Sequence, residues 1–388
     1  MNKRAPIEDP EKIEGSKKVK IIRTSATLPR VCHLYERPDS KNQRDGAGVI
    51  STALSIPRMS SGSFACSLGC DIAIKIIDDP IIKVISENIG SSYSDVKLFN
   101  NNILSCVRDI IDKHLQTKNI INTWHIEDGQ PFCLDAMANL LRAMGDPDHE
   151  FPLSMKQGTH MGDQEKIHDV GLWPDKNESN FEKNAPFVQW EKSYVTAECP
   201  QNLSRSLTMI QEDINLGYVK GPFSWKQLRK LLKCNSKDIA VGKLGLICEC
   251  EEADKWRLIF DATISGVNWR VQLPEGVELP TLQDLVGVLS SKIGWETCWT
   301  GMKIDVKTAF KRIKLTQSEY RKNVFVLNEK YYHFTVPPFG SKTSAYLWQR
   351  MAGCILRIMH GLLGVFVHTG MVYVDDLMWL FQSDQIAH

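Results

Sequence analysis

The sequence has no secretory signal and no apolar run long enough to cross a membrane. Its first 20 residues are charged and contain no apolar segment, so we expect a chain that stays outside the secretory pathway, in the cytoplasm or the nucleus. The longest apolar stretch, residues 361–374, is shorter than the roughly 20 residues that span a bilayer, and it is interrupted by His368. We therefore expect no transmembrane segment and no membrane partner.

Cysteines and histidines also lack the spacing of a metal site or a disulfide framework. The chain has 11 cysteines, an odd number, and without a secretory signal these are expected to be free thiols. Cys66 and Cys70 form a single CxxxC pair, but no second pair follows at the spacing of a structural zinc site. The histidines show no ligand spacing, and we interpret them as structural or surface residues.

Strong net charge is absent as well. The 388 residues carry a formal charge of +1, with 43% hydrophobic and 24% charged residues, which excludes a wholly disordered, collagen-like or coiled-coil protein. The positive charge is nevertheless concentrated in two segments. Residues 220–243 contain seven Lys or Arg and one acid, and residues 303–322 contain seven and two acids. These basic segments are either solvated faces or contacts to phosphates.

Three regions follow from the pattern along the chain. Residues 1–60 are polar with weak periodicity, which predicts a disordered arm. Residues 61–200 are partly helical and have no recognisable chemistry, with helices predicted over 95–115 and 134–144 and a long loop or linker over 146–184. Residues 201–388 show regular alternation of helices and strands, and we expect the functional domain there.

Within this last region, Ser224 is a plausible N-cap for a basic helix over 225–233. The strand ending in Asp305 precedes a Pro-Phe-Gly turn, a long helix and an apolar hairpin whose turn contains two aspartates. The expected elements are a helix over 204–216, hairpins over 245–260 and 320–336, a helix over 281–289, a strand over 300–306, a helix over 341–359 and the final hairpin.

Four sequence motifs in this order resemble those of reverse transcriptases of the retrotransposon and retroviral type. They are KWRLIFD at residues 255–261, MKIDVKTAFKRIKL at 302–315, PFGSKTSAYLWQ at 338–349 and YVDD at 373–376. The resemblance covers about residues 204–388. It implies an α+β fold, the fingers and palm of a right-hand polymerase with an antiparallel palm sheet packed on helices. Only twelve residues follow Asp376, so we expect this fold to be truncated at its C-terminal side.

The resemblance implies an RNA-directed DNA polymerase, a nucleotidyltransferase that adds deoxynucleotides to the primer 3'-hydroxyl on an RNA or DNA template. Asp305, Asp375 and Asp376 match the family's catalytic carboxylates. They would bind two Mg²⁺ or Mn²⁺ ions, because hard divalent cations prefer carboxylate oxygens. An Asp-Asp pair in a turn is also a common turn former, but here apolar strands flank it on both sides.

The nucleotide-binding residues implied by the resemblance are Arg257, Phe310, Phe339 and Gly340. Arg257 matches the arginine that contacts the triphosphate, and Phe310 matches the aromatic that excludes a 2'-hydroxyl and selects deoxynucleotides. The acids at residues 249–254 depart from the family, which often has lysines there, so the usual lysine contact is in doubt. Gln349 and Arg350 are predicted to lie on a helix surface.

Two hypotheses of different class follow, with a weaker third. The first is an active reverse transcriptase domain of a retrotransposon-derived protein. The second is an inactive retroelement remnant that at most binds nucleic acid through its basic segments. An RNA-templated RNA polymerase is disfavoured, since those enzymes usually have glycine before the Asp pair. The sequence identifies no protein partner.

Overall fold

The computed structural model describes residues 20–30, 64–77, 80, 100–176, 186–187, 197–290, 294–364 and 368–382. Among these residues, no helix is both long enough and apolar enough to cross a membrane. Of the predicted disordered arm, residues 20–30 form a strand, and the remainder lies outside the described residues.

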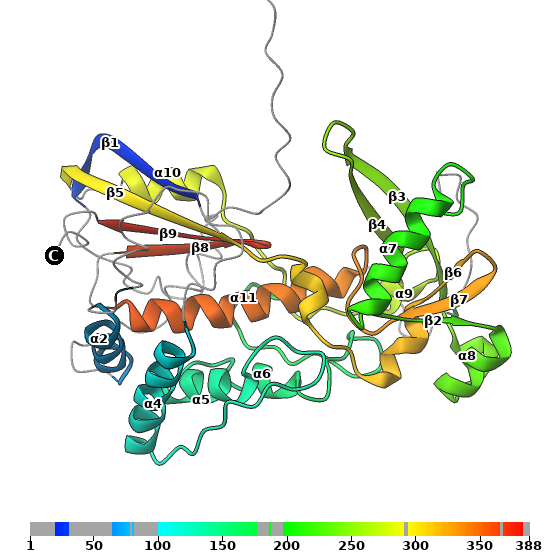
Figure 1. Cartoon of the computed structure of the whole chain (residues 1–388), viewed down its shortest axis with the longest axis horizontal. Helices are drawn as coiled ribbons and strands as arrows, with labels where there is room; N and C mark the ends of the chain where they lie inside the picture. The colour runs from blue at the N-terminus through cyan, green and yellow to red at the C-terminus, as the bar shows by residue number, and fades with distance from the viewer. Residues whose placement is uncertain are drawn as a thin grey trace, which may run out of the picture.

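The fold is α+β and contains two sheets joined by a long helix (Figure 1). The first sheet is antiparallel throughout, as the sequence predicts for a palm, and its strand order is β1-β5-β9-β8. These strands are β1 (Lys20–Arg30), β5 (Gly294–Asp305), β9 (Asp376–Gln382) and β8 (His368–Tyr373).

The second sheet has the order β2-β7-β6-β3-β4 and is mixed, because β3 and β6 run parallel while the other neighbours are antiparallel. Its strands are β2 (Val219–Phe223), β7 (Lys330–Phe334), β6 (Val324–Leu327), β3 (Val241–Cys250) and β4 (Lys255–Asp261). The predicted hairpin of β3 and β4 is confirmed.

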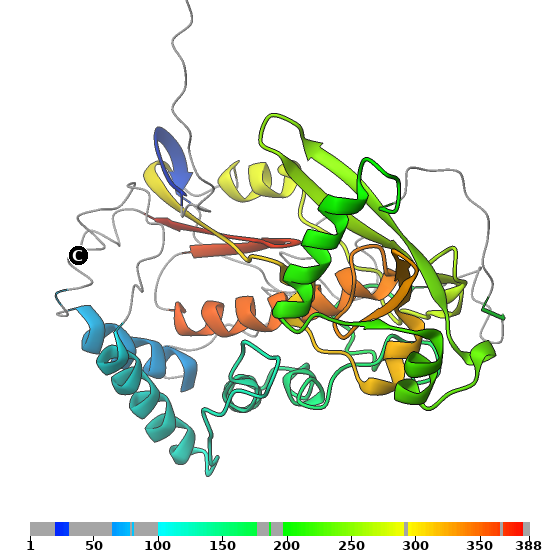
Figure 2. The ribbon, with the colours of Figure 1, turned by 45° about the vertical axis from the view of Figure 1, so that its right-hand side comes forward.

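Helix α11 (Lys342–Leu362) is the central element of the core. It runs beneath the first sheet towards the second, while α10 (Leu282–Ser290) lies on the opposite face of the first sheet (Figures 1 and 2). Leu285 of α10 packs on Met371 and Met378 of the β8–β9 hairpin. Helices thus lie on both faces of this sheet, and the hairpin residues that pack against them are apolar.

The remaining helices lie on the side of α11 away from the first sheet or around the second sheet (Figure 1). They are α2 (Phe64–Ile77), α4 (Asn101–Thr117), α5 (Leu134–Met144), α6 (Phe151–Ser154), α7 (Leu203–Asn215), α8 (Trp225–Leu232) and α9 (Val267–Arg270), with short 3₁₀ turns η1 (Ser236–Asp238), η2 (Ala309–Arg312) and η3 (Gln317–Lys322).

Local sequence patterns predict most of these elements. Helix α5 occupies the predicted residues 134–144, and α8 begins after Ser224, whose hydroxyl and Gln227 form a reciprocal capping box. One strand prediction is wrong at its start. Residues 320–322 belong to η3, and β6 begins only at Val324. The reason is that Lys322 is buried against Glu319, at 2.8 Å, an i,i+3 contact that favours a 3₁₀ turn.

Part of the predicted linker over 146–184 belongs to the core. Thr159 pairs with Leu315 in an isolated parallel bridge, and Met155, Met161 and Trp173 are buried. Its irregular backbone is therefore stabilised by contacts with distant residues, which local periodicity does not reveal.

Candidate active site

Two of the three predicted catalytic aspartates face each other across neighbouring strands. Asp305 ends β5 and is directly opposite Asp376, which begins β9. Side chains alternate along a strand, so Lys303 lies on the same face as Asp305. The Lys303 Nζ is 2.8 Å from Asp376 Oδ2, which places the Asp376 carboxylate on that face too. Both residues are partly exposed, although the Oδ2 atom of Asp305 is buried.

The turn that contains Asp375 is tied to two other elements. Tyr373 pairs with Asp376, so Val374 and Asp375 form a two-residue turn. Val374 adopts a left-handed conformation, φ 54°, which is unfavourable for a β-branched residue. Its carbonyl oxygen accepts a hydrogen bond of 2.5 Å from Nε1 of the buried Trp348 in α11. The carbonyl of Asp375 accepts one of 2.9 Å from the Val306 amide. These bonds fix where the Asp375 side chain begins.

The donor set suits a hard divalent cation. Partly buried carboxylates on one face of two adjacent strands are the oxygen ligands that Mg²⁺ prefers. Among the described residues, however, no group of three or more His, Cys, Asp or Glu side chains is gathered closely enough to hold a metal ion. Residue type and strand register therefore fit a metal site, while the three carboxylates do not converge in this conformation.

A second group of predicted residues comes together from three elements. Phe310 of η2 stacks on Phe339, with ring centroids 5.8 Å apart and planes inclined by 24°. The guanidinium of Arg257, on β4, lies 5.0 Å from the Phe339 ring centroid. Phe339 is 36% exposed, so this row of arginine and two aromatic rings is open to solvent on part of its surface. Such a row offers a cation for phosphates beside apolar surface for a sugar.

Gly340 is required by its backbone conformation and by a close approach. Its φ is 106°, and a Cβ there would lie 2.2 Å from the carbonyl oxygen of Phe260. The amide of Phe260 donates to the Phe339 carbonyl at 2.8 Å, and Asn268 Nδ2 donates to the Gly340 carbonyl at 3.2 Å. The hydrogen bond between Phe260 and Phe339 joins the Pro-Phe-Gly turn to the end of β4, and this contact keeps Phe339 next to Arg257.

The acids of the β3–β4 hairpin engage the neighbouring cations. Glu249 forms ion pairs with Arg257, at 2.7 Å, and with Lys255, at 2.9 Å. The hydrogen bond from Lys255 holds the pKa of the Glu249 carboxyl below its usual value, and the charge of Arg257 acts in the same direction. Arg257, which is expected to meet the triphosphate, thus already has a carboxylate partner, and so does the neighbouring Lys255.

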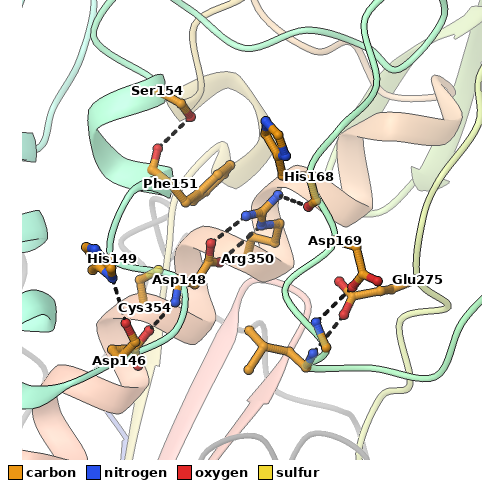
Figure 3. Close-up of polar contacts among 12 residues, drawn as sticks. Asp146, Asp148, His149, Phe151, Ser154, His168, Asp169, Glu275, Arg350 and Cys354 are labelled. Atoms are coloured by element: carbon orange, nitrogen blue, oxygen red, sulfur yellow. Dashed lines mark hydrogen bonds and ion pairs between the residues drawn. The ribbon is translucent and has the colours of Figure 1, made fainter.

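The prediction that Gln349 and Arg350 lie on a helix surface is wrong. Both are buried, at 2% and 4% exposure. Arg350 donates from two guanidinium nitrogens to the buried carboxylate of Asp148, and from a third to the His168 carbonyl at 3.1 Å (Figure 3). The error arises because residues 146–176 cover this side of α11, so a charged residue finds its partner inside the core.

Two further buried contacts extend this attachment. Arg357, about two turns beyond Arg350 on α11, pairs with Asp146 at 2.5 Å. Glu275 accepts hydrogen bonds from the amides of Leu172 and Trp173, at 2.7 and 3.2 Å, and from the Tyr346 hydroxyl at 3.0 Å. Burial raises the pKa of the Glu275 carboxyl. Residues 146–173 thereby fix the helix that supplies Trp348 to the aspartate turn.

Comparison with known proteins was made on sequence and on structure. Residues 253–388 match the family model described as reverse transcriptase (RNA-dependent DNA polymerase). A crystal structure of prototype foamy virus protease-reverse transcriptase is 15% identical with a TM-score of 0.33, covering 53% of this chain and 22% of that one. The foamy viral protease-reverse transcriptase dRH in complex with ds DNA is 16% identical with a TM-score of 0.35, covering 70% and 38%.

This chain therefore spans less than two fifths of either foamy viral chain that it resembles. A search among curated proteins finds no match.

Proposed function

We propose that this chain, whose residues 253–388 are a reverse transcriptase domain, is an RNA-directed DNA polymerase of a retroelement. It would join deoxynucleotides to a primer 3'-hydroxyl on an RNA or DNA template. The observation that supports this most directly is the register of Asp305 opposite Asp376, with Asp375 in the adjoining turn. The three aspartates of the family motifs thus belong to the same end of one sheet, although their carboxylates do not converge.

Each group of residues has a distinct part in this proposal. Asp305, Asp375 and Asp376 would hold the divalent cations, Mg²⁺ or Mn²⁺, that reverse transcriptases require. When bound, these cations supply the Lewis acidity that activates the primer hydroxyl and stabilises the leaving pyrophosphate. Arg257 and Lys255 bind the triphosphate oxygens, since guanidinium and ammonium groups match them in charge and hydrogen bonding.

Phe310 and Phe339 provide the apolar wall of the nucleotide site. The Phe310 ring stacks on Phe339. In the proposed site it would pack against the sugar and exclude a 2'-hydroxyl, so that deoxynucleotides are the substrate. Gly340 allows the backbone to approach the base, because its exposed position has no side chain.

Primer extension by the full chain tests the proposal. With an RNA template, a DNA primer, deoxynucleotides and Mg²⁺, we expect extension that stops when EDTA is added. Absence of extension with either Mg²⁺ or Mn²⁺ would contradict the proposal.

A second candidate, a chain that binds nucleic acid without polymerising, is favoured by one observation. Lys303 forms an ion pair with the Asp376 carboxylate. Among the described residues, the carboxylates of Asp305, Asp375 and Asp376 do not come close enough together to hold a metal ion. If this second candidate is correct, the chain binds a template–primer duplex but does not extend the primer with any divalent cation.

Replacing Glu249 by glutamine is expected to lower the KM for deoxynucleotides by about threefold. The substitution keeps the size of the side chain but releases Arg257 and Lys255 for the triphosphate, and a partly exposed ion pair contributes less than about 1 kcal/mol. Steady-state kinetics with a single incoming nucleotide measures the change. Glu251→Gln is the control, because Glu251 is exposed in the same hairpin and makes no ion pair with the described residues. An unchanged or higher KM for Glu249→Gln would refute this role.

Replacing Trp348 by phenylalanine is expected to lower kcat by about tenfold with little change in KM. An aromatic ring is retained, but the Val374 carbonyl loses a partly buried hydrogen bond, at a cost of about 1–3 kcal/mol, and the turn loses its fixed position. Trp379→Phe is the matched control. Trp379 is equally buried, on β9, and its Nε1 has no hydrogen-bond partner among the described residues. Equal losses of kcat in both variants would mean that packing alone, rather than the hydrogen bond, is involved.

A further inference from the structure

The structure separates the two basic segments that the sequence alone does not distinguish. In residues 303–322 the cations are largely engaged within the molecule. Lys303 pairs with Asp376, Lys311 with Asp213 at 2.6 Å, and the buried Lys322 with Glu319 and Asp163. Arg312, Lys314 and Arg321 donate to carbonyl or amide oxygens. Of this segment, only the exposed Lys307 has no such contact to its side chain among the described residues.

Helix α8 and the residue after it are different. Lys226, Arg229, Lys230 and Lys233 are all exposed, and none of their side chains makes an ion pair or hydrogen bond within the described part of the chain. Their spacing of three, four and seven residues places them along one side of the helix. Four positive charges therefore lie close together without forming an ion pair among the described residues, and they repel one another.

These four side chains also line a hollow in the surface. Together with Trp225, Cys234 and Asn235 they line a pocket of about 490 Å³ that is open to solvent. Trp225 is partly buried and held in place by Tyr331, with ring centroids 4.9 Å apart. Cys234, whose pKa is raised by burial, lies close enough to Arg321 and Asp238 for their charges to act on it. The surroundings thus add one cation and one carboxylate, and the pocket stays strongly positive.

We propose that this α8 pocket binds single-stranded nucleic acid, and specifically the template strand. A row of cations beside an aromatic ring is the usual design for a single strand, because the cations meet successive phosphates and the ring contacts bases without regard to sequence. The pocket lies next to β2, β7 and η3, at the outer edge of the second sheet and away from the β8–β9 turn (Figure 1). The assignment to the template rests on the proposed polymerase function.

The test is the salt dependence of binding to a fluorescent single-stranded RNA, measured by anisotropy with the full chain. Replacing Lys226, Lys230 and Lys233 together by glutamine is expected to reduce the slope of log K against log salt by about 2, since each phosphate contact contributes about 0.7 for single strands. Affinity at low salt should fall about tenfold. Glutamine is a good helix former, so α8 is expected to be retained.

The matched control removes three lysines from another face. Lys75, Lys113 and Lys118, on or next to α2 and α4, are exposed, and the triple glutamine variant has the same net charge as the α8 variant. It should keep the wild-type slope. An unchanged slope in the α8 variant, or an equal loss in both variants, would overturn the proposal. Poly-glutamate and unlabelled RNA can be compared, at equal concentration of charge, as competitors of the fluorescent RNA. If poly-glutamate competes as strongly as RNA, the pocket binds anions in general, and the proposal is overturned.

Failure of this inference is distinguishable from failure of the proposed function. If the wild-type chain extends primers but the α8 variant binds RNA with the wild-type slope, the pocket is not the template contact. If the α8 variant shows the reduced slope but no primer is extended by the wild type, single-strand binding stands and the polymerase proposal fails. Wild-type chain that binds no RNA at low salt contradicts this inference outright.

Discussion

Replacing Asp305 by asparagine is expected to reduce the rate of primer extension by about 10³-fold or more while the chain stays folded. Asparagine has nearly the same shape but no charge, so the site loses a cation ligand rather than a packing contact. Removal of a single electrostatic contact in an active site typically costs 10²–10³-fold, and loss of a metal ligand affects every charge that the cation stabilises. Asp375→Asn should have a similar effect, because the proposed function assigns both side chains to one metal site.

The comparison is made by single-turnover extension with saturating Mg²⁺ and nucleotide. Asp109→Asn, at an exposed position of α4 outside the site, is the control and should retain the wild-type rate. Circular dichroism and thermal unfolding verify that the variants are folded. A rate within threefold of wild type for Asp305→Asn would show that this carboxylate takes no part in catalysis.

Replacing Arg350 by leucine is expected to lower the free energy of unfolding by about 3–5 kcal/mol. The substitution leaves the carboxylate of Asp148, only 1% exposed, buried without its cation, and an uncompensated buried charge is strongly destabilising. Burial alone would lower the pKa of Arg350, but the hydrogen bonds and charge of Asp148 act in the opposite direction and the pKa is raised. Urea unfolding followed by tryptophan fluorescence measures the change.

The chain offers a matched control for this effect. Arg142 and Glu150 also form an ion pair, at 2.9 Å, but both side chains are well exposed, at 45% and 67%. Arg142→Leu should therefore cost less than about 1 kcal/mol. A double variant, Arg350→Leu with Asp148→Leu, should be more stable than the single variant, because no charge is left unpaired. Equal destabilisation by Arg350→Leu and Arg142→Leu would refute the role of residues 146–173 as part of the core.

The fold of residues 201–382 could largely be predicted from sequence, whereas the attachment of residues 146–176 could not. Helix α8 begins after Ser224, the predicted N-cap, and the hairpin of β3 and β4 follows its alternating pattern. Both predictions depend on residues that are close together in the sequence. By contrast, Asp148 and Arg350 are 202 positions apart, and neither has a local pattern that indicates its partner. The burial of Arg350 depends on the folding of the chain between these two residues, so it cannot be predicted from the local sequence.

The candidate site shows the same division. Asp305, Asp375 and Asp376 could be found because their motifs occur in a fixed order, and the structure places Asp305 opposite Asp376. Trp348 was missed as a contact of the turn, although it lies within the Pro-Phe-Gly motif. A tryptophan on a buried helix face gives no sign that its Nε1 reaches a carbonyl 26 positions later.

Direct binding of a divalent cation tests the central claim, that Asp305, Asp375 and Asp376 form a metal site. Mn²⁺ can be titrated into the full chain, with a deoxynucleotide present, and followed by electron paramagnetic resonance. We expect saturable binding by the wild type and at least tenfold weaker binding by a variant with both Asp305→Asn and Asp375→Asn. Mn²⁺ binding of equal strength in the wild type and this variant would contradict the claim.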